Sequence, residues 1–145
     1  MRILAGLISF GRLVFGVAFI AQPGLMERAW IGKQARLPGA RLLARAVGSR
    51  DLVLGLCGLQ ALGRDDGSAA RSWLAAASVC DAVDFGATLA AGRGIPRETR
   101  NGVLGVAGVA SVLSAIAAAG VGRGDDAGLV PTAPPDSVRA AEPGG

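Results

Sequence analysis

Four long apolar stretches dominate this chain of 145 residues, at positions 3–21, 39–62, 72–91 and 102–121. A helix needs about 20 mostly apolar residues to cross the hydrocarbon core of a bilayer. The stretches are continuous and rich in alanine, whereas the strands of a membrane barrel alternate in polarity over about ten residues. The sequence therefore predicts an all-α protein: a four-helix transmembrane bundle over residues 1–122.

The connections between these stretches are short and rich in proline, glycine or charge, so neighbouring helices should run antiparallel. In the first connection, Leu25, Met26, Ala29 and Trp30 follow a helical spacing, which predicts a short interfacial helix after the first span. A cleaved signal peptide is the alternative for the first span, but Arg12 interrupts its apolar run. Residues 123–145 hold too little apolar surface to fold, and we expect a disordered polar tail.

The amino-acid composition excludes several kinds of catalytic and metal site. Histidine is absent and there are two cysteines, so Ser-His-Asp triads, His-ligated zinc and four-cysteine zinc sites are excluded. We therefore expect no enzyme, no metal and no cofactor. The net charge of +4 comes from arginines placed between apolar stretches, with few aromatic residues to stack on bases. Membrane lipids are the expected partner, together with a second copy of the chain or another membrane protein, and nucleic acid is not.

Basic residues also predict the orientation in a cell membrane, because cytoplasmic loops carry an excess of lysine and arginine. The first and third connections carry seven basic residues, and the opposite side carries four. This predicts a multi-pass protein with both termini outside the cytoplasm. The seven are Arg28, Lys33, Arg36, Arg41, Arg93, Arg97 and Arg100; the four are Arg2, Arg64, Arg71 and Arg123.

Ionisable residues inside the predicted spans are the candidate site. Each costs about 2.5 to 3.5 kcal/mol if it faces lipid at mid-membrane, so each must pair or meet water. Three arginines and three aspartates sum to zero charge, which predicts a self-neutralising intramembrane network. The six residues are Arg12, Arg45, Arg50, Asp51, Asp81 and Asp84.

Depth and helical facing predict the partners in this network. Arg12 should pair with Asp81 or Asp84, and Arg50 should take the remaining aspartate or reach another helix, while Arg45 lies shallower and can snorkel. Thr88 shares the face of Asp84 and is a candidate polar neighbour. Small residues on two other faces predict close helix packing; they are Gly48, Gly55 and Gly58 on the second span, and Ala107, Ser111 and Ala115 on the fourth.

Three functions fit this pattern. The leading one is a non-enzymatic membrane subunit or scaffold with a fixed Arg/Asp network. The alternative is a small transporter or channel component in which Asp51, Asp81 and Asp84 relay a proton or cation. A membrane redox protein using Cys57 and Cys80 is third, although small buried apolar residues are the better interpretation of the two cysteines.

Three strings carry a family resemblance: residues 11–16 (GRLVFG), residues 45–55 (RAVGSRDLVLG) and residues 81–84 (DAVD). Together they resemble a family of small four-helix membrane proteins of unknown function from actinobacteria and fungi, over roughly residues 5 to 120. The first string is also similar to the wider DoxX-like membrane proteins. The resemblance implies a four-helix architecture and a membrane location, and it supplies no activity.

Overall fold

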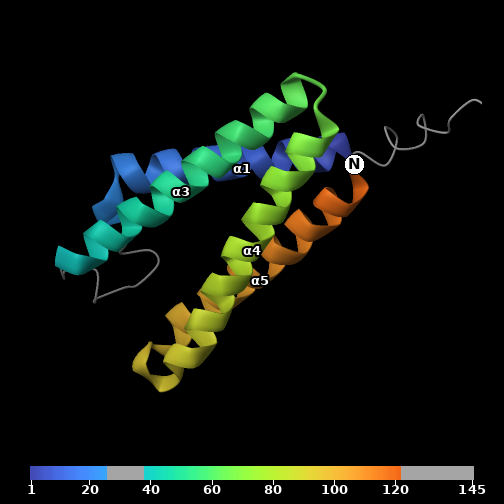
Figure 1. Ribbon diagram of the computed structural model, residues 1–145. Helices are drawn as coiled ribbons and strands as arrows, with labels where there is room; N and C mark the ends of the chain where they lie inside the picture. Colours follow the sequence, from blue (N-terminus) through green and yellow to red (C-terminus); the bar gives the residue numbers. More distant parts are fainter. Residues whose placement is uncertain (26–37, 122–145) are drawn as a thin grey trace, which may run out of the picture.

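The computed structural model describes residues 1–25 and 38–121, and all regular structure in these two segments is helical (Figure 1). The helices are α1 (Arg2–Ala21), α3 (Pro38–Gly63), α4 (Gly67–Ala91), the 3-10 turn η2 (Gly92–Gly94) and α5 (Arg97–Gly120). The predicted all-α class is therefore confirmed. Met26, Ala29 and Trp30 of the predicted interfacial helix and the predicted disordered tail lie outside the described residues.

Two helices begin about five residues earlier than the apolar stretches suggest, because caps rather than hydropathy set their ends. Asp66 caps α4: its carboxylate accepts hydrogen bonds from the Ala69 backbone N–H and the Ser68 hydroxyl, both at 2.9 Å. These bonds, that of Ala69 foremost, lower the pKa of the Asp66 carboxyl. Pro96 precedes α5, whose first turn is polar.

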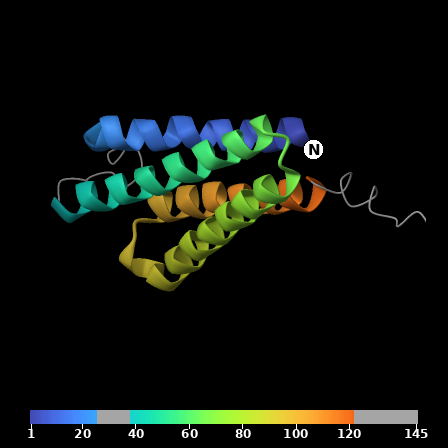
Figure 2. The same cartoon turned by 45° about the horizontal axis from the view of Figure 1, so that its top comes forward.

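The long helices form two antiparallel pairs, with α1 lying along α3 and α4 along α5 (Figures 1 and 2). The pairs converge at the end that holds the N-terminus and the turn between α3 and α4. There the core consists mostly of alanines, which let four backbones approach closely. This core comprises Ala5, Ala61, Ala70, Leu74, Ala117, Ala118 and Val121.

Three of the described helices are long and apolar enough to cross a membrane: α1, α4 together with η2, and α5. Helix α3 is not among them, which departs from the four spans that the sequence predicts. Its 26 residues contain Arg41, Arg45, Arg50 and Asp51, and these charges lower its mean hydropathy.

Glycine makes the contact between α1 and α3 possible. A Cβ on Gly55 would lie 2.5 Å from the Ser9 carbonyl oxygen and 2.6 Å from the Leu13 nitrogen, closer than real side chains come to backbone. Gly48 faces Gly16 and Phe19 in the same way, and Gly58 faces Ser9. The predicted small-residue face of α3 therefore lies against α1.

Substitution of Gly55 by alanine should destabilise the protein, because two rigid backbones would have to separate. Overpacking of this kind costs about 1 to 3 kcal/mol. Gly86 on α4 is the matched control, since nothing lies within 4 Å of a Cβ placed there. Gly86→Ala should be neutral or stabilising by up to about 1 kcal/mol through helix propensity. Thermal unfolding in detergent distinguishes the two, and equal melting temperatures for both variants would contradict the close packing.

Candidate functional site: a buried Arg/Asp cluster beneath a groove

Arg12 lies midway along α1, on the face that α1 turns inward. The residues buried on this helix are Ala5, Ser9, Arg12, Gly16 and Phe19, which follow one helical stripe. The apolar residues on either side keep α1 helical, and the stripe of small residues brings Arg12 up to the neighbouring helices. An arginine is therefore enclosed at the centre of an otherwise apolar helix.

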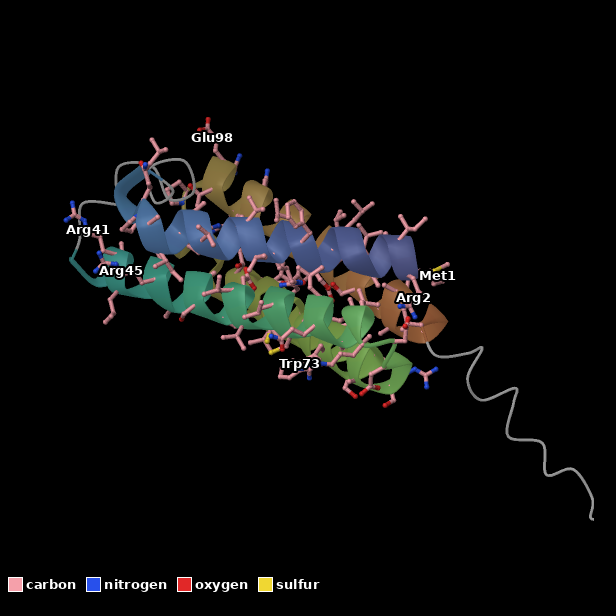
Figure 3. All side chains as sticks on the ribbon, turned by 90° about the horizontal axis from the view of Figure 1, so that it is seen from above. Met1, Arg2, Arg41, Arg45, Trp73 and Glu98 are labelled. Atoms are coloured by element: carbon pink, nitrogen blue, oxygen red, sulfur yellow. The ribbon has the colours of Figure 1, made fainter. Side chains whose placement is uncertain are left out.

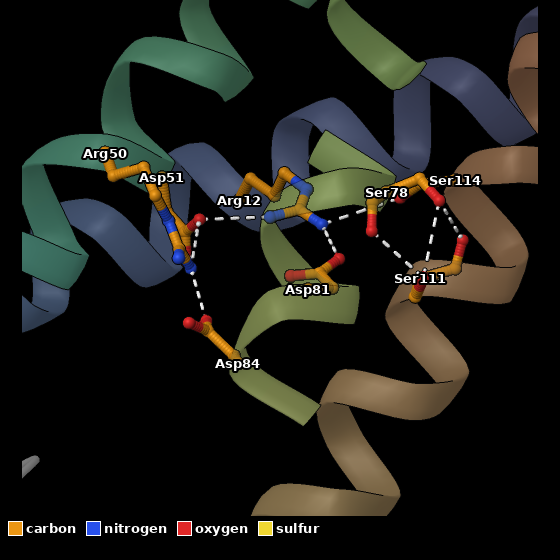
Figure 4. Close-up of polar contacts among 8 residues, drawn as sticks. All are labelled: Arg12, Arg50, Asp51, Ser78, Asp81, Asp84, Ser111 and Ser114. Carbon is orange, nitrogen blue, oxygen red and sulfur yellow. Dashed lines mark hydrogen bonds and ion pairs between the residues drawn. The ribbon is translucent and has the colours of Figure 1, made fainter. Parts of the chain in front are cut away.

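The guanidinium of Arg12 contacts all three other long helices (Figure 4). Its Nη1 donates to Asp51 Oδ1 on α3 at 3.0 Å, and its Nη2 donates to Asp81 Oδ2 on α4. Nη2 also lies 3.5 Å from the hydroxyl of Ser114 on α5, a residue with no exposed surface. Arg12, Asp51 and Asp81 have side chains only 10%, 7% and 8% exposed. Of the two partners that the sequence allows for Arg12, the structure brings Asp81 into contact.

Arg50 extends this cluster from α3 towards α4. Its Nη2 lies 2.9 Å from Asp84 Oδ2 and 3.4 Å from Asp51 Oδ1. Asp84 is thus the nearer partner, which agrees with the prediction that Arg50 takes the remaining aspartate. Arg50 and Asp84 are more open than the first three residues, with side chains 27% and 38% exposed. The cluster therefore has a closed centre at Arg12 and an accessible edge at Asp84.

Two serines beside the cluster join α4 to α5. The Ser78 hydroxyl donates to the Ser111 carbonyl oxygen at 2.9 Å, and the Ser111 hydroxyl donates to the Ser78 carbonyl oxygen at 3.0 Å. Sequence reasoning selected Ser111 but missed Ser78 and Ser114. The available signal was a serine in the middle of an alanine-rich helix, since a hydroxyl in an apolar medium can bind across to a neighbouring helix.

Three residues that the sequence groups with the site lie apart from it. Arg45 is exposed and makes no ion pair with any residue that the structure describes, because it sits one to two turns before Arg50, towards the end of α3. The Thr88 hydroxyl is bound to the Asp84 carbonyl oxygen of its own helix at 2.7 Å. Ala115 is exposed, because steps of four residues drift by roughly 40° each around a helix. The buried face of α5 instead follows Ala107, Ser114, Ala117 and Ala118.

The position of Arg45 changes the charge of the site. Arg12 and Arg50 supply two positive charges, and Asp51, Asp81 and Asp84 supply three negative charges, so the contacting cluster sums to −1 rather than zero. Its hydrogen bonding is also incomplete, since Arg12 Nε and Arg50 Nε are buried without a partner among the described residues. The contacting cluster therefore carries surplus negative charge.

A groove of about 540 Å³ opens above the cluster, between α1 and α5. The two helices meet where Met1 reaches Gly120 and separate towards the other end of the molecule (Figure 1). Arg12, Arg50, Asp51, Asp81 and Asp84 form its base. Its walls are mainly apolar; they include Leu7 and Phe15 of α1, and Val106, Val109 and Leu113 of α5.

Comparison with protein-family models, characterised proteins and solved structures finds no match for this chain. Both cysteines are free thiols and half-buried. Among the described residues, no group of three or more histidine, cysteine, aspartate or glutamate side chains is arranged to hold a metal ion. The cluster and the groove are therefore the features of the molecule that bear on its function.

The pairing of Arg12 with Asp81 predicts a clear result in a double-mutant cycle. Arg12→Gln and Asp81→Asn should each destabilise the protein by about 3 to 5 kcal/mol, because each leaves a buried charge without its partner. The double variant should lose less than the sum of the two, by about 0.5 to 3 kcal/mol. Thermal unfolding in detergent measures all three variants.

Arg2→Gln is the matched control for this cycle. Arg2 also pairs with an aspartate, Asp65, but both side chains are exposed, so its loss should cost no more than about 1 kcal/mol. Strictly additive losses in the double variant, or a loss from Arg2→Gln as large as that from Arg12→Gln, would contradict the buried pairing.

Proposed function

We propose that this chain is a small multi-pass membrane protein that acts without catalysis, as a membrane subunit held together by its Arg/Asp cluster. The observation that carries the proposal is the distribution of polarity, which is the reverse of that in a water-soluble protein. Large apolar side chains face outward, with Ile3 82%, Leu42 74% and Val79 63% exposed. The charged side chains of Arg12, Asp51 and Asp81 are instead buried inside the molecule. Hydrocarbon is the solvent that suits this arrangement.

The proposal includes α3 as a fourth span despite its low hydropathy. Two of its four charges, Arg50 and Asp51, point into the cluster, and large apolar side chains lie on the surface that it presents outward. Leu42, Leu43, Val53 and Leu56 form that surface. Arg41 and Arg45 lie within about 11 Å of the start of the helix, where long side chains reach the lipid headgroups (Figure 3). We therefore propose a four-helix transmembrane bundle, as the resemblance of the sequence to the family of small four-helix membrane proteins implies.

As a subunit, the chain would meet its partners through the outward apolar faces of its helices. Those partners are membrane lipids and either a second copy of the chain or another membrane protein. The cluster then serves to fix the two helix pairs relative to each other, since Arg12 alone bonds to α3, α4 and α5. A buried ion pair adds little stability compared with apolar packing, so the proposed role of the cluster is to specify one arrangement of the helices.

A second candidate, a small transporter or channel component, is favoured by the surplus charge. A cluster with three carboxylates and two guanidinium groups has room for one more positive charge, which a proton or a transported cation supplies. A scaffold is expected to co-purify with another chain, whereas a transporter is expected to bind a solute. The two candidates share the same membrane placement and the same residues.

Reporter fusions test the membrane placement and the topology together. Fusions after Gly67, at the start of α4, and at the C-terminus should report an extracytoplasmic location, whereas a fusion after Gly94, between α4 and α5, should report a cytoplasmic one. The reason is the excess of basic residues at the end of the molecule that holds the connection between α4 and α5, where Arg93, Arg97 and Arg100 lie. Paired reporters, each active on one side only, make the measurement.

The outcomes separate the two parts of the proposal. Cytoplasmic signals from all three fusions would contradict a membrane-spanning protein. If the fusions after Gly67 and at the C-terminus report a cytoplasmic location and the fusion after Gly94 an extracytoplasmic one, the membrane placement stands and only the orientation is overturned.

A further inference from the structure

We infer that the groove between α1 and α5 binds a monovalent amphipathic cation, with its charged group at Asp81 and Asp84 and its apolar body between the two helices. The inference rests on the membrane placement proposed above and names the ligand class of the same site. The groove volume of about 540 Å³ falls within the range of about 300 to 1,000 Å³ typical of small-molecule sites.

Charge at the base of the groove selects the sign of the ligand. The five charged residues there sum to −1, and an unbalanced carboxylate next to hydrocarbon is unfavourable. One added positive charge removes this imbalance, whereas an anion would increase it and a divalent cation would exceed it. The base therefore complements a single positive charge.

The carboxylates of α4 show where that charge would sit. Asp81 bonds through Oδ2 to Arg12, and Asp84 bonds through Oδ2 to Arg50 (Figure 4). The Asp84 side chain is 38% exposed, and both residues line the groove. Two carboxylates on successive turns of α4 thus face one ligand group from the base of the groove.

The walls of the groove select the rest of the ligand. Leu7, Phe15, Val106 and Leu113 offer apolar contact and no oxygen ligands, whereas a hard inorganic cation such as Ca²⁺ takes six to eight oxygens. Gly11 and Gly105 leave the walls recessed, since a Cβ at either position would meet nothing within 4 Å. An organic body in contact with these walls would enter sideways from the hydrocarbon. The ligand is therefore an organic cation that is itself soluble in lipid.

Tetraphenylphosphonium is a suitable probe, because tetraphenylborate has nearly the same shape and the opposite charge. Binding is measured on the full chain in detergent by equilibrium dialysis of the labelled phosphonium, with empty micelles as background. We expect saturable phosphonium binding that unlabelled phosphonium displaces, and no saturable binding of labelled tetraphenylborate measured in a separate experiment. Asp84→Asn should weaken binding by about tenfold or more, a change of about 1.4 kcal/mol or more.

A pair of glycine variants tests the location without altering any charge. Gly105→Leu places a side chain in the groove and should also weaken binding by about tenfold or more, a loss of about 1.4 kcal/mol. Gly102→Leu is the matched control on the same helix: it lies outside the groove lining, has equal room for a side chain, and should leave binding unchanged. This pair keeps the test decisive even if Asp84→Asn does not fold.

Two kinds of result would overturn the inference. One is the absence of saturable phosphonium binding to the wild-type chain, or saturable binding of tetraphenylborate, measured separately, with equal affinity. The other is binding that survives Gly105→Leu to the same extent as Gly102→Leu. If the reporter test shows a membrane-spanning chain but these binding tests fail, only the ligand assignment is refuted. If all reporters are cytoplasmic, the proposed function itself is refuted.

Discussion

A single guanidinium in an apolar interior constrains most of this structure. Arg12 sits at the middle of α1, where a charge without partners is costly, and it reaches carboxylates on two other helices and a hydroxyl on the fourth. The carboxylates reach Arg12 only if the helices approach closely, which requires small residues between them. Between α1 and α3 these are Gly16, Gly48 and Gly55, and between α4 and α5 they are Ser78 and Ser111.

The same constraint explains why the cluster is not symmetrical. Arg12 bonds to Asp51 and Asp81 in the enclosed centre, whereas Arg50 and Asp84 form an edge that opens into the groove. The groove exists because α1 and α5 touch near Met1 and Gly120 and separate beyond that point. A wedge-shaped opening with a charged base and apolar walls follows from how the two helix pairs cross. The crossing of the helix pairs and the charge at the base of the groove thus both depend on where Arg12 and its partners lie.

Helical periodicity made much of this arrangement predictable from the sequence. The stripe of Ser9, Arg12, Gly16 and Phe19 is the buried face of α1, and the pairing of Arg12 with an aspartate of α4 follows from depth and facing. Depth also set Arg45 apart, since it lies shallower on its helix and can snorkel, but the charge count still included it in the network. The structure leaves Arg45 out of the contacts, so the predicted neutral network is a cluster of charge −1.

The buried salt bridge of Arg12 is tested most directly by solid-state nuclear magnetic resonance on the protein in lipid bilayers. Arginine side-chain nitrogens are labelled with ¹⁵N and aspartate carboxyl carbons with ¹³C, and the dipolar coupling between them reports direct contact. We expect guanidinium-to-carboxylate coupling in the wild-type protein, with a component that disappears in Arg12→Gln and remains in Arg45→Gln. Identical spectra for the wild type and Arg12→Gln would contradict the account, because Arg12 would then have no carboxylate within contact distance.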